Sequence, residues 1–163
     1  MKPNCILHPQ LAHALATLGH GDIVLVTDAG FPIPADANRI DLGFYPGTVD
    51  VLEILSVLSG ELCVEEVRFD TEVRDRNPKL YKSVQEIYTG SGADFGIANH
   101  AELVADIAPK AKVIIRSGSF NAYANFALTA ATDANAWFTD IDPLPAYVER
   151  RKRIEEQYVP SLK

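Results

Sequence analysis

Residues 23–30 read Ile23-Val24-Leu25-Val26-Thr27-Asp28-Ala29-Gly30, four consecutive apolar side chains followed by a polar turn. An unbroken apolar run of strand length is typical of a strand covered on both faces, as in a parallel sheet. A second such run, Val113-Ile114-Ile115, ends in Arg116-Ser117-Gly118. The two runs predict interior strands of a largely parallel sheet.

Around these runs the chain alternates helical and extended patterns. Helices are expected from Pro9 to about Gly19, from the N-cap Thr48 to Gly60, and from Pro78 to about Gly90. Another helix is expected to carry Leu103, Val104 and Ile107, and further strands are expected at 39–42, 62–69, 95–98 and 126–128. Such interleaving predicts a layered α/β fold, with a mostly parallel central sheet and helices on both faces.

The composition bounds the class of protein. The chain has 163 residues, of which 47% are hydrophobic and 23% charged, and this balance argues against disorder. The net charge of −7 would repel phosphate backbones, so we expect no nucleic-acid partner. No apolar run approaches the roughly 20 residues that span a bilayer, so we expect no membrane partner. With no signal-peptide core, and with Cys5 and Cys63 read as free thiols, a cytoplasmic location is expected.

The last part of the chain differs in character from the rest. We expect residues 1–132 to form one α/β domain and residues 133–163 to form a C-terminal extension. The extension contains a proline-rich acidic stretch at 140–145 and then a highly charged segment from Tyr147 to Tyr158. This segment is interpreted either as a surface helix or as an arm that clasps another subunit.

Several polar residues stand where predicted strands begin or end. In open α/β sheets, ligands bind outside the carboxyl ends of the strands. Asp28 stands just after the first apolar run and Arg116 directly follows the second, and Asn125 precedes the last predicted strand. These groups could converge on one pocket; the candidates are His20, Asp28, His100, Arg116, Tyr123 and Asn125.

Each candidate also has a purely structural interpretation. His20 could interact with the dipole at the end of the first helix, and Asp28 could form an Asx turn. Arg116 could pair with Asp28 or Asp41. The remaining candidates could be ordinary loop and turn residues: His100, Tyr123 and Asn125.

Common cofactor and hydrolase motifs are missing from the sequence. It contains neither GxGxxG nor GxxxxGK[ST], and no HExxH spacing or GxSxG elbow. Two isolated cysteines give no zinc pattern. A metal held by His20, Asp28 and His100 is the remaining alternative, and we expect no metal.

Two motifs resemble those of the D-ribose pyranase and L-fucose mutarotase family. They are Leu18-Gly19-His20-Gly21-Asp22 and Asp28-Ala29-Gly30-Phe31-Pro32-Ile33-Pro34. The resemblance extends in order to Asn125, and the ribose branch is the nearer one, because Gly30 stands where the fucose branch typically has a histidine. Further matches are Arg39-Ile40-Asp41, Asn77-Pro78, His100, Ile115-Arg116-Ser117-Gly118 and Tyr123-Ala124-Asn125.

The resemblance implies roles for individual residues. His20 matches the catalytic histidine of the family, and the sugar-binding positions are matched by Asp28, His100, Tyr123, Ala124 and Asn125. The family works without a cofactor on a free monosaccharide and forms ring-like homo-oligomers, often decamers. Its members usually end soon after the last strand, so the extension at 133–163 is a departure that leaves assembly and substrate choice open.

The implied chemistry is plausible for these side chains. Opening a cyclic hemiacetal requires removal of the proton from the anomeric hydroxyl and delivery of a proton to the ring oxygen. An imidazole, which titrates at about pH 6.5 when unperturbed, can do either near neutral pH. The expected function is therefore a cofactor-free isomerase of sugar ring forms, acting on D-ribose. The alternatives are a mutarotase of L-fucose or another sugar, and a sugar-binding module without turnover.

Overall fold

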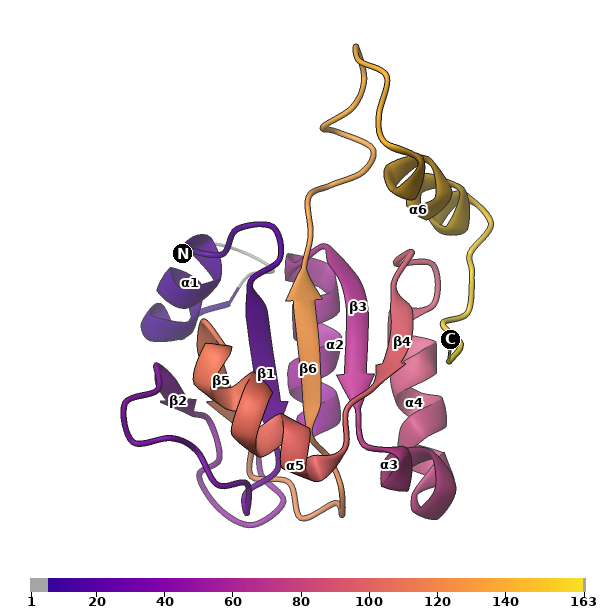
Figure 1. Ribbon diagram of the computed structural model, residues 1–163. Helices are drawn as coiled ribbons and strands as arrows, with labels where there is room; N and C mark the ends of the chain where they lie inside the picture. Colours follow the sequence, from indigo (N-terminus) through magenta and orange to yellow (C-terminus); the bar gives the residue numbers. More distant parts are fainter. Residues whose placement is uncertain (1–5, 163) are drawn as a thin grey trace.

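Six strands form one mixed sheet with the order β2-β5-β1-β6-β3-β4 in the computed structural model (Figure 1). The structure describes residues 6–162, so the interpretation of Cys5 as a free thiol lies outside the described residues. The strands are β1 (Ile23–Thr27), β2 (Arg39–Asp41), β3 (Val64–Phe69), β4 (Asp94–Ile97), β5 (Val113–Arg116) and β6 (Phe126–Ala130).

One strand runs against the other five. β1 pairs in parallel with β5, β5 with β2, and β3 with β4, whereas β6 is antiparallel to both β1 and β3. In Figure 1 the arrow of β6 points opposite to those of β1, β3 and β4. The prediction of an α/β fold with a mostly parallel sheet is confirmed.

Both faces of the sheet are covered, as the unbroken apolar run of β1 predicts. Val24 and Val26 pack into one hydrophobic core, whereas Leu25, which lies between them, packs into a second core on the opposite face. Ile114 joins Leu25 in the second core, and its neighbours on β5 join the first core. All of these side chains are fully buried, so neither face of the central strands meets water.

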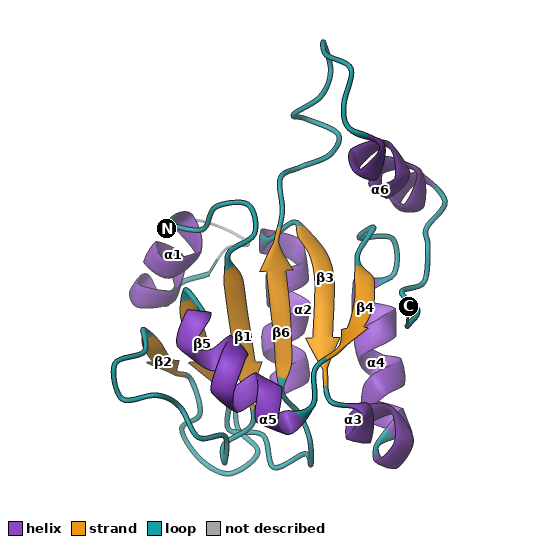
Figure 2. Ribbon diagram, in the orientation of Figure 1, coloured by secondary structure: helices purple, strands orange, loops and turns teal. Residues whose placement is uncertain are grey.

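The helices divide between the two faces (Figures 1 and 2). The first core contains side chains from α1 (Pro9–Ala16), α2 (Val51–Glu61), α3 (Thr71–Arg76) and α4 (Pro78–Tyr88). The second contains side chains from one irregular helical segment, made of α5 (His100–Glu102), the π-helical η1 (Leu103–Ile107) and the 3-10 turn η2 (Ala108–Lys110). Among residues 6–162 no helix is long and apolar enough to cross a bilayer.

Local chemistry changes both expected boundaries of α2 and adds one short helix. The N-cap of α2 is Asp50 rather than Thr48, because Asp50 and Glu53 form a reciprocal capping box. The helix continues through Gly60 to Glu61, so Gly60 does not stop it. The short helix α3 has no periodic apolar pattern and was not expected from the sequence; it begins where Asp70 accepts a hydrogen bond from the amide of Glu72.

The C-terminal extension folds back on its own chain. After β6 a long loop leads to α6 (Pro145–Glu155). Figure 1 shows this helix beyond the edge of the sheet at which β6 ends. The buried Arg150 donates a hydrogen bond to the carbonyl of Thr132 over 2.7 Å. The last described residue, Leu162, forms a parallel bridge with Phe95 of β4. Within one chain, the extension is therefore attached at several points.

Gly118 lies where two loops meet, and only a glycine fits there. A Cβ atom at Gly118 would overlap the carbonyl oxygen of Thr48 and lie 2.9 Å from that of Tyr45. We expect Gly118→Ala to lower the free energy of unfolding by at least about 2 kcal/mol.

Gly60 in α2 is the matched control, because nothing lies within 4 Å of its added Cβ. Gly60→Ala should raise stability by about 0.5–1 kcal/mol. Urea denaturation measures both; equal stability of the two variants would contradict the packing described.

Candidate functional site

The antiparallel direction of β6 brings two sequence-distant polar residues to one edge of the sheet. Asp28 directly follows β1, and Asn125 directly precedes β6. Because β1 and β6 run in opposite directions, with Val26 opposite Phe126, the end of one strand meets the start of the other. The edge at the carboxyl ends of the parallel strands therefore carries both side chains; we call it the polar edge.

Asp28 and Asn125 bind each other reciprocally. The amide nitrogen of the Asn125 side chain donates to Asp28 Oδ2 over 3.0 Å, and the backbone N–H of Asp28 donates to Asn125 Oδ1 over 3.1 Å. Asp28 Oδ1 also accepts the backbone N–H of Gly30 over 2.9 Å, so the expected Asx turn is present. Each carboxylate oxygen has a further lone pair, which leaves Asp28 able to accept hydrogen bonds from a ligand.

Tyr123 and Ala124 precede this pair in a strained turn. Tyr123 has a φ of +65°, a left-handed conformation that bulky residues rarely adopt, and the residue is 41% exposed. The carbonyl of Tyr123 accepts the backbone N–H of Asn125 over 2.8 Å. Ala124 is fully buried in the first core. The turn thus leaves Tyr123 at the surface while it directs Asn125 inward to Asp28.

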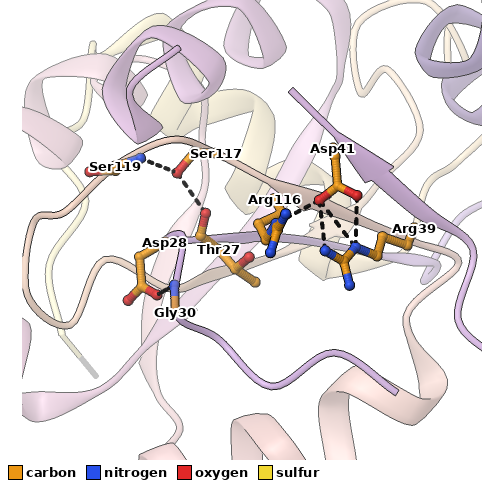
Figure 3. A network of polar contacts seen from close by, with 8 residues as sticks. All are labelled: Thr27, Asp28, Gly30, Arg39, Asp41, Arg116, Ser117 and Ser119. Carbon is orange, nitrogen blue, oxygen red and sulfur yellow. Dashed lines mark hydrogen bonds and ion pairs between the residues drawn. The ribbon is translucent and has the colours of Figure 1, made fainter. Parts of the chain in front are cut away.

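The loop after β5 is hydrogen-bonded to the turn at the polar edge (Figure 3). The hydroxyl of Ser117 donates to the carbonyl of Thr27 over 2.7 Å and accepts the N–H of Ser119 over 3.1 Å. The carbonyl of Ser119 then accepts the N–H of Ala29 over 3.0 Å. The Ser119 hydroxyl donates to Asp50, the N-cap of α2, over 2.7 Å. These bonds hold the turn after Asp28 in one position.

Arg116 belongs to a separate ion-pair cluster on the same edge. Its Nε lies 2.6 Å from Asp41 Oδ1. Arg39 donates hydrogen bonds to the same carboxylate from two nitrogens, Nε and Nη2 (Figure 3). Partial burial on its own would raise the pKa of Asp41, but the hydrogen bonds and charges of Arg39 and Arg116 outweigh it and lower that pKa. Of the two partners expected for Arg116, Asp41 is the one observed.

His100 is the first residue of α5, whose N-cap is Asn99. Its ring contacts Phe31 edge to face, with ring centroids 5.9 Å apart. Phe31 directly follows the turn that begins at Asp28. His100 is therefore linked to the polar edge through one aromatic side chain.

The polar edge contains an open hollow with an aromatic rim. A cavity of about 380 Å³ is lined by Asp28, Gly30, Phe120 and neighbouring residues. Three exposed aromatic residues stand around this edge: Phe44 (92%), Tyr45 (68%) and Phe120 (74%). A larger hollow of about 670 Å³ lies elsewhere, between the start of α1 and α2, and is lined mainly by apolar side chains. We place the candidate site at the polar edge, because that hollow contains a predicted site residue and the larger one does not.

His20 lies at the opposite edge of the sheet. It precedes β1, whereas Asp28 follows it, so five extended residues, or about 17 Å, separate the two ends. His20 sits in a tight turn in which Gly21 has a φ of +85° and donates its N–H to the carbonyl of Ala130 over 2.8 Å. Asp22 closes this turn by accepting the N–H of Gly19 over 2.8 Å. Because α1 already ends at Ala16, the interpretation of His20 as a helix-dipole partner is wrong.

Two side chains approach the imidazole of His20 from distant parts of the sequence. Its Nε2 lies 3.9 Å from a carboxylate oxygen of Glu65 in β3. Its ring centroid lies 6.2 Å from that of Tyr147 in α6. No motif predicts either contact, because each depends on how the sheet and the extension fold.

Within one chain, therefore, the predicted site residues form two groups. Asp28, Tyr123 and Asn125 lie at the polar edge, and His100 contacts this group through Phe31. His20 is the predicted site residue that lies at the opposite edge. Among residues 6–162 no group of three or more His, Cys, Asp or Glu side chains is arranged to hold a metal ion. The sequence pattern did not single out the supporting contacts of Ser119, Asp50 and Glu65.

The fold is that of a compact α/β domain with a mixed six-stranded sheet, and its sequence identifies the family. Residues 1–132 match the sequence profile of the RbsD / FucU transport protein family. A relative named D-ribose pyranase 1, from Streptomyces griseus, is 42% identical over 138 residues, which cover 85% of this chain and 90% of the relative. The chain belongs to the RbsD / FucU family.

Two solved structures and one further relative extend the comparison. Bacillus subtilis RbsD complexed with D-ribose is 34% identical, with a TM-score of 0.75, and the match covers 82% of this chain and 99% of that one. The Streptococcus pneumoniae fucose mutarotase in complex with L-fucose shares the fold, with a TM-score of 0.68. It is 23% identical, and the match covers 80% of this chain and 96% of that one. D-ribose pyranase 2 of Rubrobacter xylanophilus is 36% identical over 152 residues, which cover 93% of this chain and 97% of the relative. That alignment is longer than residues 1–132, so it includes part of the extension.

The cluster around Asp41 predicts a pH-dependent stability. The lowered pKa means that the charged Asp41 stabilises the fold above the ordinary aspartate pKa of about 3.9, and that this contribution is lost as the pH falls through the folded-state pKa. We expect Asp41→Asn to reduce the free energy of unfolding at pH 7, and we expect this reduction to disappear as the pH falls from 7 through the lowered pKa of Asp41. Asp36→Asn, at an exposed position in the preceding loop, is the control. Urea denaturation across this pH range measures both; a pH-independent effect of Asp41→Asn would contradict the account.

Proposed function

We propose that this protein is a cofactor-free isomerase that interconverts the pyranose and furanose forms of D-ribose by opening and closing the ring. The observation that carries the proposal is the reciprocal Asp28–Asn125 pair at an open hollow, in a chain 42% identical to a D-ribose pyranase. A fixed carboxylate and amide suit a sugar, because each sugar hydroxyl both donates and accepts a hydrogen bond.

The proton transfers are assigned to His20. One proton leaves the anomeric hydroxyl and another reaches the ring oxygen as the C–O bond breaks, which yields the open-chain aldehyde. Closure on a different hydroxyl reverses both transfers and changes the ring size. An imidazole that can accept and release a proton near neutral pH can serve both directions. Asp28, His100, Tyr123, Asn125 and the backbone of Ala124 are assigned to sugar binding.

This assignment requires a second copy of the chain. Opposite edges of one sheet carry His20 and Asp28, so a sugar held at Asp28 is out of reach of the same chain's His20. We propose that the partner's His20 completes each site. The exposed aromatic rim of Phe44, Tyr45 and Phe120 supports this arrangement, since such side chains are commonly covered by a protein partner. A ring-like homo-oligomer, with a decamer as the form that the resemblance implies, and a cytoplasmic location remain predictions.

Exchange between ring forms tests the function directly. We would measure NMR saturation transfer between the pyranose and furanose signals of D-ribose, and separately between ring forms and anomers of L-fucose. The wild-type protein should accelerate exchange of ribose. His20→Ala should reduce the enzymatic rate by about 10²–10⁴-fold, the range expected for loss of a general acid–base. His13→Ala, an exposed histidine on α1, is the matched control and should behave as wild type.

Each other outcome has a defined meaning. Full activity in His20→Ala would remove His20 from the mechanism. Acceleration of fucose exchange alone would identify a different substrate. Binding of ribose without any acceleration, detected as a ribose-dependent rise in the melting temperature, would identify a sugar-binding module instead of an enzyme.

A further inference from the structure

The C-terminal extension places an aromatic pair beside His20. The rings of His20 and Tyr147 lie 6.2 Å apart at an angle of 45°, within the range in which aromatic side chains attract each other. Phe138 packs against Tyr147 with ring centroids 4.2 Å apart. Both residues belong to the extension, whereas His20 belongs to the turn before β1. The extension therefore reaches the histidine to which proton transfer is assigned.

This contact follows from where the extension begins. Since β6 is antiparallel to β1, it ends at the edge where β1 starts, and Ala130 exchanges backbone hydrogen bonds with Gly21 and Asp22. The chain that continues beyond β6 thus emerges beside the His20 turn. Tyr147 follows Ala130 by only 17 positions in the sequence, and the loop after β6 turns back to α6 within that length.

Charged contacts hold the aromatic pair in place. Arg153 of α6 lies 2.7 Å from Asp94 of β4, and both side chains are largely buried. Arg151 donates to the carbonyls of Ala134 (2.7 Å) and Phe138 (3.3 Å), which ties the loop to the helix. α6 is therefore fixed both to the sheet and to the loop that contains Phe138.

We propose that Tyr147 is a positioning residue for His20, through which the extension takes part in the ring-opening reaction. The inference rests on the proposed function, because it takes His20 as the group that moves protons. Tyr147 and Glu65 contact the imidazole from two elements, and each limits the orientations that it can adopt. A general acid–base acts only within hydrogen-bonding reach of the reacting oxygens, so a freely rotating ring would transfer protons less often.

The contact described joins the ring of Tyr147 to the ring of His20. Tyr147→Ala should lower kcat for ribose exchange by about three- to tenfold, the size expected for one aromatic contact, and change KM by less than about twofold. An effect on kcat without an effect on KM is the sign of lost transition-state positioning, as opposed to lost binding. Tyr147→Phe keeps the ring and should stay within about twofold of the wild-type kcat.

Neighbouring residues provide matched controls in the full-length protein. Val148→Ala, at an adjacent and exposed position of α6, should leave kcat unchanged. Phe138→Ala removes the ring behind Tyr147 and should give a smaller loss of kcat, whereas Trp137→Ala, at the exposed neighbouring position, should have no effect. These loop variants keep the test possible if Tyr147→Ala does not fold.

A spectroscopic readout tests the contact without relying on turnover. The imidazole proton signals of His20 should shift in Tyr147→Ala and remain in place in Val148→Ala, because only the former removes a neighbouring aromatic ring. Unshifted signals in Tyr147→Ala would overturn the proposal.

The kinetic results separate this proposal from the function on which it rests. A wild-type kcat in Tyr147→Ala, with only a lower melting temperature, would show a merely structural role and overturn the inference, while ribose exchange by the wild-type protein would still stand. A wild-type protein that does not accelerate exchange of any sugar would instead overturn the proposed function.

Discussion

The antiparallel pairing of β1 with β6 is the contact on which both ends of the molecule depend. At one end it joins Asp28 to Asn125 through two hydrogen bonds between residues 97 positions apart. At the other end it ties the His20 turn to Ala130, because Gly21 donates to the carbonyl of that residue. A parallel β6 would place Asn125 at the His20 edge and direct the extension away from it. One strand direction therefore determines which polar groups meet.

This pairing also separates the parts of the proposed mechanism. The carboxylate that we assign to sugar binding and the imidazole that we assign to proton transfer lie at opposite edges of the same sheet, so the proposed chemistry requires two chains. Association would then be a condition of catalysis and not merely of stability. The extension lies at the edge of the sheet that carries His20, where Tyr147 contacts the imidazole. Arg150 and Arg153 attach the extension to its own chain, and this attachment fixes the position of Tyr147 beside His20.

Local patterns in the sequence predict much of this fold, and long-range contacts account for what they miss. The apolar runs of β1 and β5 indicate a sheet covered on both faces because every side chain in them is hydrophobic, and the Asx turn at Asp28 follows from a short polar residue before Gly30. The direction of β6 is not encoded in its own composition. Nor does proximity along the chain reveal that His20 meets Glu65 and Tyr147. The cap of α2 is different, because Asp50 with Glu53 three residues later is a local capping box that the sequence itself contains, and the choice of Thr48 overlooked it.

The central claim, that the partner's His20 acts on a sugar held at Asp28, is tested most directly by mixing two inactive variants. Chains with His20→Ala and chains with Asp28→Asn would be unfolded together, refolded as a mixture, and assayed for ribose exchange by NMR, beside each variant refolded alone. If sites form between copies, about a quarter of the sites in an equal mixture regain both residues, so activity returns. A mixture as inactive as its components, although light scattering shows that it has assembled, would contradict a site shared between two chains.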